Sequence, residues 1–304
     1  MATDLSETVL RNASENFYRS IGLFRYVGVV SSFALILLAT AGAGHADAQS
    51  AATQNAAAAD PTEQTLACGA NASSPLVNGA FPVPFGVGER MEYDVKFSSL
   101  KVGTGVMEVR DVSDVRGKPS WHTALTIHGK AFWTFNVDIL LESWFDVQTL
   151  ASRKFHQDQK YPTYSKNSTT LMFPERGMYK EDEKDEQVSV TSPLDDGSFI
   201  YFFRTLPLEI GQTYSLPCYF KPDKNPVKVT VSRRETITTP AGTFKTIVLQ
   251  PRLKAGGIFG EKGKAEVWLT DDSTRMMVQL KSELSVGSIN LYLAKYKLFT
   301  PAKP

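Results

Sequence analysis

The chain of 304 residues is 42% hydrophobic and 21% charged, so it can bury a sizeable core as one large domain or two modest ones. Its 33 Lys and Arg residues are balanced by 32 Asp and Glu residues. This balance provides no long-range field of one sign that would collect a polyanion, and it argues against a nucleic-acid partner.

Residues 1–48 have the features of an export signal. Two arginines precede an uncharged run, YVGVVSSFALILLATAGAG, which ends in small residues before Ala46-Asp47-Ala48, an A-x-A cleavage pattern. The run is just long enough to span a membrane, so a retained anchor is the alternative. Its strongly apolar centre is short, which favours cleavage and leaves no stable transmembrane segment in the mature chain. We therefore expect an exported protein in the periplasm of a Gram-negative bacterium.

Residues 49–80 are polar and low in complexity, and they predict a disordered linker. The two cysteines, Cys68 and Cys218, form an even count in a chain that leaves the reducing cytosol. This favours a disulfide, provided that the two Cα atoms approach within bonding range. Cys68 also resembles a lipid-attachment site, but the residues before it are polar.

Strand signals dominate from residue 81 to residue 300. Val, Thr, Tyr and Phe alternate with polar residues in RMEYDVKF, TGVMEVRDV, WHTALTIHG, KNSTTLMF, PVKVTVSRRE, TFKTIVLQP, KAEVWLT and MMVQLKSEL. Turn formers such as RGKP, PERG, PAG and TDDS lie between these segments. The pattern predicts a single antiparallel β domain in which one face of each strand is apolar.

One segment breaks the alternation. In SPLDDGSFIYFFRTLPLEIG the apolar and aromatic residues have no period of two. Asp195 or Asp196 is a candidate cap for a short helix carrying the residues from Phe199 to Arg204, and Leu206-Pro207 would end it. We expect this helix to lie against the concave side of the sheet.

An internal repeat links residues 85–160 with residues 208–290. VGERM matches IGQTY with an offset of 123 between the glycines, since 211 − 88 = 123. Further along, Gly117 corresponds to Gly242, Glu142 to Glu266 and Trp144 to Trp268, in the same order and at nearly the same offset. We interpret the domain as two related strand modules that form a highly curved antiparallel sheet or half-open barrel.

Asp271 and Asp272 in EVWLTDDS are the most conspicuous catalytic candidates, because adjacent carboxylates can bind a metal or divide acid and base roles. The matching residues of the first module are Val147 and Gln148. What the modules share is a strand that runs into a turn, which favours a structural role for the acid pair. Ser98 and Lys101 satisfy S-x-x-K, but the companion S-D-N and K-T-G motifs are missing. The histidines fit no zinc pattern, no serine lies in a G-x-S-x-G elbow, and no glycine loop fits a phosphate motif. We therefore predict no catalytic residue, metal or cofactor.

Aromatic residues are the remaining candidates for a binding surface. They are Phe132, Trp133, Phe135, Tyr201, Phe202 and Phe259. Such residues more often belong to the core, which is the alternative. Each large side chain left in water forgoes roughly 1.5 to 3 kcal/mol of burial free energy. Soluble monomers seldom expose large apolar patches, so a sheet with two faces must curl, carry polar residues or hold an apolar ligand.

Several ordered motifs carry a resemblance to a known family. They are FPVPFGVGERMEYDVKF, DDGSFIYFFRTLPLEIGQTY, TITTPAGTFKT, EVWLTDDSTRMMV and SVGSINLYL, and they cover about residues 81 to 298. Together they resemble the bacterial exported family called domain of unknown function 3108. Met276 and Met277 stand where that family tends to have a proline. The resemblance implies a strongly curved, incompletely closed barrel similar to bacterial lipoprotein carriers, and it implies no activity.

These observations favour a non-enzymatic envelope protein that binds an apolar or amphipathic ligand on a concave sheet face. The ligand would be a lipid, an acyl chain or a lipidated partner. A protein-interaction or assembly module of the envelope is the alternative, with a protein partner at a sheet edge or exposed aromatic residues. A hydrolase that uses Asp271 or Asp272 is the second alternative.

Overall fold

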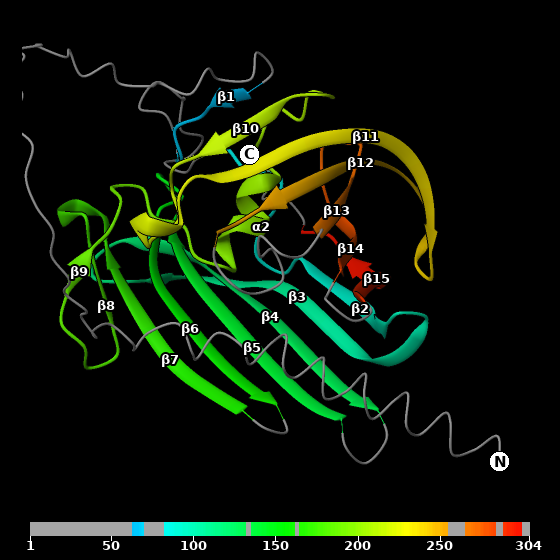
Figure 1. Cartoon of the computed structure of the whole chain (residues 1–304), viewed down its shortest axis with the longest axis horizontal. Coiled ribbons are helices and arrows are strands. Elements are labelled where there is room, and N and C mark those ends of the chain that lie inside the picture. The colour runs from blue at the N-terminus through cyan, green and yellow to red at the C-terminus, as the bar shows by residue number, and fades with distance from the viewer. Residues whose placement is uncertain are drawn as a thin grey trace, which may run out of the picture.

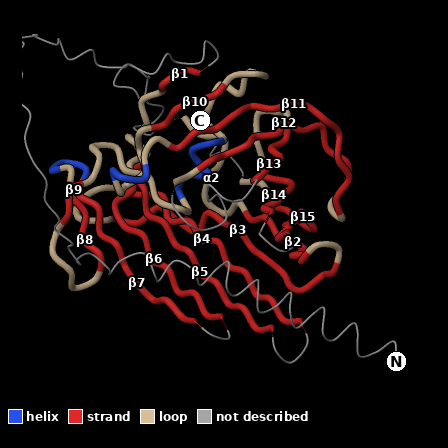
Figure 2. Tube along the Cα trace, in the orientation of Figure 1, coloured by secondary structure: helices blue, strands red, loops and turns tan. Residues whose placement is uncertain are grey.

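The computed structural model describes residues 63–69, 82–131, 135–161, 164–254, 265–283 and 288–299. The predicted export signal and most of the predicted linker lie outside these ranges. The described residues form one open sheet of 15 strands that curves around a short helix, α2 (Figures 1 and 2). Among them, no helix is both long and apolar enough to cross a membrane.

The strands are β1 (Glu63–Thr65), β2 (Arg90–Phe97), β3 (Leu100–Asp114), β4 (Pro119–Ala131), β5 (Phe135–Asp146), β6 (Ser152–Tyr161), β7 (Tyr164–Phe173), β8 (Met178–Glu181), β9 (Gln187–Val188), β10 (Thr213–Leu216), β11 (Val227–Thr239), β12 (Gly242–Arg252), β13 (Ala265–Thr270), β14 (Met277–Glu283) and β15 (Ser288–Lys297). The helix α2 spans Ser198–Phe203, and two 3₁₀ turns span Pro174–Arg176 and Pro222–Lys224.

The strand order is β1-β10-β11-β12-β13-β14-β15-β2-β3-β4-β5-β6-β7-β8-β9. Strands β2 to β9 and strands β10 to β15 are therefore two consecutive series, joined where β15 pairs with β2. All neighbouring pairs are antiparallel except β1 and β10. The long β11–β12 hairpin bends away from the rest of the sheet (Figure 1).

The two series begin alike. Gly88 and Gly211 both have a positive φ, +86° and +85°, a conformation that glycine adopts without steric cost. The Gly88 amide donates to the Val109 carbonyl at 2.9 Å, and the Gly211 amide donates to the Val231 carbonyl at 2.8 Å. A register shift follows each of these valines, in β3 and in β11. A further shift follows Trp144 in the first series and Trp268 in the second. Such bulges bend a strand and increase its twist, which accounts for curvature at matching points.

The apolar core lies on the face of the sheet that carries α2, called here the inner face. In β2, Met91, Tyr93 and Val95 are buried at alternate positions, as the period of two predicts. All six residues of α2 are buried against the same core. The remaining residues of each strand point to the opposite face, called here the outer face.

A buried ion pair ties three parts of the chain together. Arg204, directly after α2, donates to the two carboxylate oxygens of Glu89 at 2.6 and 2.9 Å, and both side chains are 0% exposed. The guanidinium also donates to the carbonyl oxygens of Pro84 and Thr274. The pair thereby connects the start of β2, the end of α2 and the β13–β14 turn.

The predicted disordered linker is wrong for a short part of its length. Within residues 49–80, β1 pairs in parallel with β10, and Cys68 forms a disulfide with Cys218 at an S–S distance of 2.02 Å. Lys228 adds an ion pair to Glu63 at 2.7 Å. The polar sequence EQT has no strand signal of its own. It is a strand here because β10 offers unpaired backbone groups and the disulfide holds the segment beside them.

Candidate functional site

The structure places the predicted aromatic residues that it describes in the core. Tyr201 and Phe202 are 3% and 6% exposed. The Tyr201 hydroxyl donates to the Glu108 carbonyl at 3.1 Å, and its ring packs edge-on against Phe85. A ligand on the inner face would reach these two side chains only if α2 moved.

The other aromatic candidates are not placed. Phe132, Trp133 and Phe259 lie outside the described residues, as does the side chain of Phe135 at the start of β5. Their predicted role in ligand binding stays a prediction.

The carboxylate of Asp272 closes the turn between β13 and β14. Its Oδ1 atom accepts hydrogen bonds from the Thr270 hydroxyl at 2.9 Å, from the Thr274 hydroxyl at 2.6 Å and from the amides of Thr274 and Arg275. Partial burial acts to raise the pKa of Asp272, but these hydrogen bonds outweigh it and hold the pKa below its ordinary value. The carboxylate is therefore ionised and engaged by its own turn.

Asp271 has a different environment. Its Oδ2 atom accepts from Arg234 at 2.9 Å, in an ion pair near the surface. In the corresponding turn of the first series, Asp146 accepts from the amides of Gln148 and Thr149. A carboxylate thus caps the turn in both series, although from a different position, which agrees with the turn interpretation of the acid pair.

A hollow of about 460 Å³ lies between this turn and the end of α2. It is lined by Pro84, Arg204, Thr205, Leu206, Asp271, Asp272, Ser273 and Arg275. Within the described ranges, no group of three or more His, Cys, Asp or Glu side chains is placed to hold a metal ion. Arg204 belongs to the buried ion pair, Asp271 pairs with Arg234, and Asp272 closes the turn. Arg275 donates to the Leu206 carbonyl and Thr205 to the Phe202 carbonyl, both at 2.8 Å.

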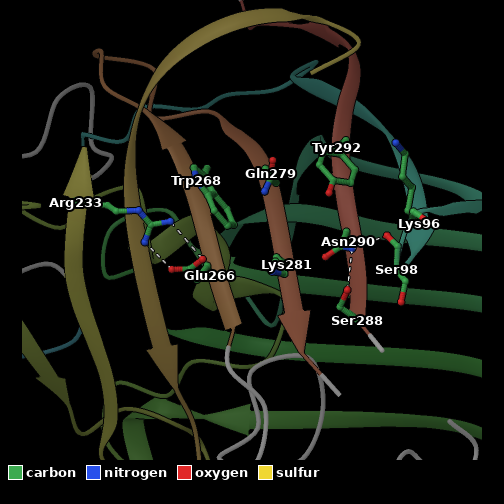
Figure 3. Close-up of a pocket in the computed structure, with 11 residues that line it drawn as sticks. Lys96, Ser98, Arg233, Glu266, Trp268, Gln279, Lys281, Ser288, Asn290 and Tyr292 are labelled. Atoms are coloured by element: carbon green, nitrogen blue, oxygen red, sulfur yellow. Dashed lines mark hydrogen bonds and ion pairs between the residues drawn. The ribbon is translucent and has the colours of Figure 1, made fainter. Parts of the chain in front are cut away.

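A larger hollow, of about 580 Å³, lies on the outer face of β13, β14, β15 and β2, and we call it the outer groove (Figure 3). It is lined by Lys96, Ser98, Ser99, Arg233, Glu266, Trp268, Gln279, Lys281, Ser288, Asn290 and Tyr292. The β11–β12 hairpin curves over one end of these strands (Figure 3). Two aromatic rings, three cations and several hydrogen-bonding groups thus share one hollow, and none of the described lining residues is aliphatic.

Sheet register brings these side chains together in two rows. Glu266 lies opposite Lys281, Lys281 opposite Asn290, and Asn290 opposite Lys96. In the adjacent row, Trp268 lies opposite Gln279, and Gln279 opposite Tyr292. Residues directly opposite on neighbouring strands share a face. The polar positions of KAEVWLT, MMVQLKSEL and RMEYDVKF were part of the alternation in the sequence, but only the pairing of the strands assembles them.

Arg233 is held at one side of the groove by two carboxylates. It donates to Glu266 at 2.7 Å and to Glu235 at 2.9 Å, and the Trp268 indole also donates to Glu235 at 2.6 Å. The hydrogen bond with Glu266 raises the pKa of Arg233. Partial burial acts to raise the pKa of Glu266, but hydrogen bonds from Arg233 and Gln250 outweigh it and lower the pKa. Arg233, Glu235 and Glu266 are therefore charged at neutral pH.

The opposite side of the groove is basic. The Lys96 ammonium lies 4.9 Å from the centre of the Tyr292 ring, within the range of a cation–π contact. Lys101, which lies opposite Lys96, pairs with Asp94 at 2.6 Å. The lining itself carries three cations and one carboxylate, 3 − 1 = 2, so the groove has an excess of positive charge.

The first series carries part of the same arrangement. Arg110 contacts Glu142 and Glu108 as Arg233 contacts Glu266 and Glu235. Trp144, two residues after Glu142, is covered by the stacked His122 ring at 4.3 Å and by the Lys154 ammonium at 4.1 Å. The tryptophans of the two series therefore have related surroundings.

The neighbouring strands of the two series differ. Register places His156, Thr169 and Leu171 of the first series where Lys281, Asn290 and Tyr292 stand in the second. The arginine, glutamate and tryptophan are thus common to both series, whereas these three groove residues are particular to the second.

Comparison with known proteins identifies a family. The family profile described as "Protein of unknown function (DUF3108)" matches residues 92–294. Among proteins with curated descriptions, none matches this chain.

Several solved structures are similar in outline. A β-barrel-like protein of domain of unknown function DUF1849 from Brucella abortus is 10% identical, with a TM-score of 0.46 over 72% of this chain and 100% of its own. A protein from Parabacteroides distasonis, provisionally described as a lipoprotein, is 12% identical, with a TM-score of 0.31 over 71% and 98%. A protein from Bacteroides fragilis, provisionally described as exported with a YmcC-like fold, is 13% identical, with a TM-score of 0.27 over 72% and 99%. At these scores the likenesses do not bear on what the present chain binds.

Proposed function

Because the chain belongs to the DUF3108 family of proteins of unknown function, we propose a function from the outer groove itself: the protein is an exported envelope protein that binds an amphipathic ligand without catalysis. The observation that carries the proposal is a hollow of about 580 Å³ that combines the rings of Trp268 and Tyr292 with charged and hydrogen-bonding side chains. Binding sites commonly combine such rings with a few polar groups that fix orientation.

Export is supported by the disulfide. Disulfides persist in oxidising compartments and are rare in the reducing cytosol. The bond between Cys68 and Cys218 joins the segment after the predicted signal to the strand domain. The bond therefore supports export to an oxidising compartment such as the envelope.

The chemistry of the groove favours the polar end of an amphipathic molecule. None of the described lining residues is aliphatic, and cations stand over both rings, Lys96 over Tyr292 and Arg233 at 5.8 Å from Trp268. A buried acyl chain would have few apolar partners here. A head group with hydroxyl or charged substituents would meet hydrogen-bonding groups and the methylene stems of the long side chains.

The proposal differs from the sequence-based expectation in the face that it uses. On the inner face, α2 and the core fill the space beside β5, and the six residues of the helix are buried. The groove lies on the outer face, where Trp268 and Asn290 are buried but Lys96, Gln279, Lys281 and Tyr292 remain partly exposed. We therefore assign the ligand to the outer groove rather than to Tyr201 and Phe202.

The test compares Tyr292→Ala with Leu171→Ala. These residues occupy equivalent positions in the two series and both are half-buried, but only Tyr292 lines the groove. Protein is purified from its native host, and bound small molecules are measured by native mass spectrometry and solvent extraction. We expect a bound amphiphile in the wild type and in Leu171→Ala, and less of it in Tyr292→Ala at an unchanged fold. Wild-type protein that carries no amphiphile and is not stabilised by any would refute the proposal.

A further inference from the structure

We propose that Gln279 forms a subsite for a neutral vicinal diol in the outer groove, the chemistry of a glycosyl or glycerol head group. This inference rests on the proposed function and specifies its ligand, which would be an amphiphile whose head group is uncharged where it meets Gln279. The subsite is defined by the position of Gln279 between two aromatic residues, by its hydrogen-bonding capacity and by its difference from the first series.

Register places Gln279 between the two aromatic residues of the groove. Gln279 in β14 lies opposite Trp268 in β13 on one side and opposite Tyr292 in β15 on the other (Figure 3). Neighbouring strands are about 4.8 Å apart, so each ring stands on a strand next to the amide. Trp268 is buried, whereas Gln279 and Tyr292 remain partly exposed and line the groove. A ligand in the groove can therefore reach the Gln279 amide and the Tyr292 side chain.

The Gln279 amide has unused hydrogen-bonding capacity. It carries two N–H donors and a carbonyl oxygen with two lone pairs. Within the part of the chain that the structure describes, no residue forms a hydrogen bond with this side chain, and the same holds for the Tyr292 hydroxyl. The amide offers a donor and an acceptor side by side. Two adjacent hydroxyls can therefore bind it together, one accepting from the N–H and the other donating to the oxygen.

The charges near Gln279 have partners within the protein, which favours a neutral ligand. Arg233 donates to Glu266 at 2.7 Å and to Glu235 at 2.9 Å. Lys281 lies opposite Glu266 and interacts with its charge. An anion would be repelled by the carboxylates, and it could only accept hydrogen bonds. A hydroxyl both donates and accepts, so it can use the amide, the cations and the carboxylate of the lining.

The Tyr292 side chain supports the same class of ligand. The Lys96 ammonium lies 4.9 Å from the centre of the Tyr292 ring. A ligand would therefore contact the ring edge and the hydroxyl of Tyr292, and the ammonium would be a further donor to its oxygen atoms. The C–H groups of a sugar or glycerol unit would pack against the ring edge, while its hydroxyls face the amide.

In the first series the position of Gln279 holds a lysine. Register places Lys154 and Leu171 where the second series has Gln279 and Tyr292. The Lys154 ammonium lies 4.1 Å from the centre of the Trp144 ring, so it is engaged by a contact within the protein. The amide of the second series has no such contact with the described residues. The shared module therefore does not account for Gln279.

The experiment measures affinity for three probes by isothermal titration calorimetry, below the concentrations at which they form micelles. Octyl β-glucoside carries vicinal diols on a sugar ring, and 1-O-octylglycerol carries one on an open chain. Octyl tetraethylene glycol ether has the same alkyl chain and no vicinal diol. Gln279→Leu removes the amide. Lys154→Leu is the matched control, because Lys154 occupies the equivalent position of the first series and both residues are half-buried.

We expect each diol probe to bind the wild type about tenfold more tightly than the ether probe, as expected for two hydrogen bonds that the ether cannot form. Gln279→Leu should reduce this preference to within about twofold, whereas Lys154→Leu should retain it. Tighter binding of the glucoside would identify a glycosyl head group, and tighter binding of octylglycerol would identify a glycerol head group. Equal affinities for the two would identify the diol alone as the recognised group, and each of these results supports the subsite.

Two outcomes would overturn the inference in different ways. An ether probe that binds as tightly as the diols, or a preference for diols that survives in Gln279→Leu, would remove the diol subsite while leaving the proposed binding function in place. Failure of all three probes to bind folded wild-type protein at low millimolar concentration would remove the proposed function, and the inference would fall with it.

Discussion

Replacing Glu89 by Gln should show how strongly the buried ion pair with Arg204 organises the domain. Both side chains are 0% exposed. Removal of one member of a buried pair typically costs about 3–5 kcal/mol, because the remaining charge is left uncompensated. Arg204 keeps the carbonyl acceptors of Pro84 and Thr274, at 2.9 and 2.8 Å, and Gln still offers one oxygen. We therefore expect Glu89→Gln to lower the free energy of unfolding by about 3 kcal/mol, the lower end of that range.

The assay is urea unfolding followed by tryptophan fluorescence, with Arg204→Met and the double variant completing a cycle. Arg204→Met should cost more than Glu89→Gln, because it also leaves two buried carbonyl groups without a donor. The double variant should be more stable than the sum of the two single effects predicts, by about 2 kcal/mol, since the two groups interact directly. A cost below about 1 kcal/mol for Glu89→Gln, or strictly additive effects, would refute this account. Ligand binding in the outer groove should be unaffected in the folded variants.

Three further predictions follow from the described contacts. Asp272→Ala should lower the free energy of unfolding by about 1–3 kcal/mol, because the turn loses its hydrogen-bond acceptor. Asp271→Ala should lower it by less than about 1 kcal/mol, because it removes only a surface ion pair with Arg234. Equal effects in denaturant unfolding would contradict the turn interpretation. The double change Cys68→Ser and Cys218→Ser removes a disulfide that closes a loop of sequence separation 150, and chain entropy limits the resulting loss in free energy of unfolding to about 5 kcal/mol. Hydrogen exchange should show that the amides of β1 lose protection. Unchanged protection would mean that strand pairing alone holds the segment. Burial and the charge of Asp195 raise the pKa of Asp196 to about 6. The folded protein therefore keeps this proton to higher pH than the unfolded chain does. The free energy of unfolding should fall as the pH rises from about 4 to about 6. Asp196→Asn should remove this loss and gain about 2–3 kcal/mol relative to the wild type between pH 4 and pH 7; parallel stability curves for the two proteins would exclude it.

The strands and the helix were predictable because their signals are local. RMEYDVKF alternates apolar and polar residues and is β2, and SFIYFF lacks that alternation and is α2. The turns were also local, since Gly88 and Gly211 need a positive φ that few other residues adopt. These features depend on residues within a few positions of one another.

β1 was not predictable from such signals. Its three residues are polar, and they form a strand only because β10 and the disulfide are nearby in space. The burial of α2 was likewise not predictable from local sequence. Tyr201 and Phe202 were candidates for a binding surface because a sheet has two faces and one short helix cannot cover both, but these two rings are buried in the core.

The outer groove depends on register over long sequence distances. Asn290 lies opposite Lys96, and register shifts in the β15–β2 and β2–β3 pairs decide which side chains stand together. A shift of one residue would move every side chain of a strand to the other face. The sequence contained the alternating polar positions, but nothing local distinguishes a polar residue that lines a groove from one that faces solvent.

Comparison of the two series helps to distinguish residues that maintain the fold from residues that line the groove for another reason. If the two series descend from one module, contacts found in both are explained by the module itself. Arg110 with Glu142, and Arg233 with Glu266, each span an intervening strand and hold β3 to β5 and β11 to β13. The first of these contacts occurs in the half of the sheet away from the groove, so neither needs a ligand to account for it. Lys281, Asn290 and Tyr292 line the groove, and different residues, His156, Thr169 and Leu171, stand at the matching positions of the first series, so the shared module does not account for them. Selective pressure for binding would act on these positions, which is why substitutions there should change affinity, while substitutions in the shared contacts should change stability.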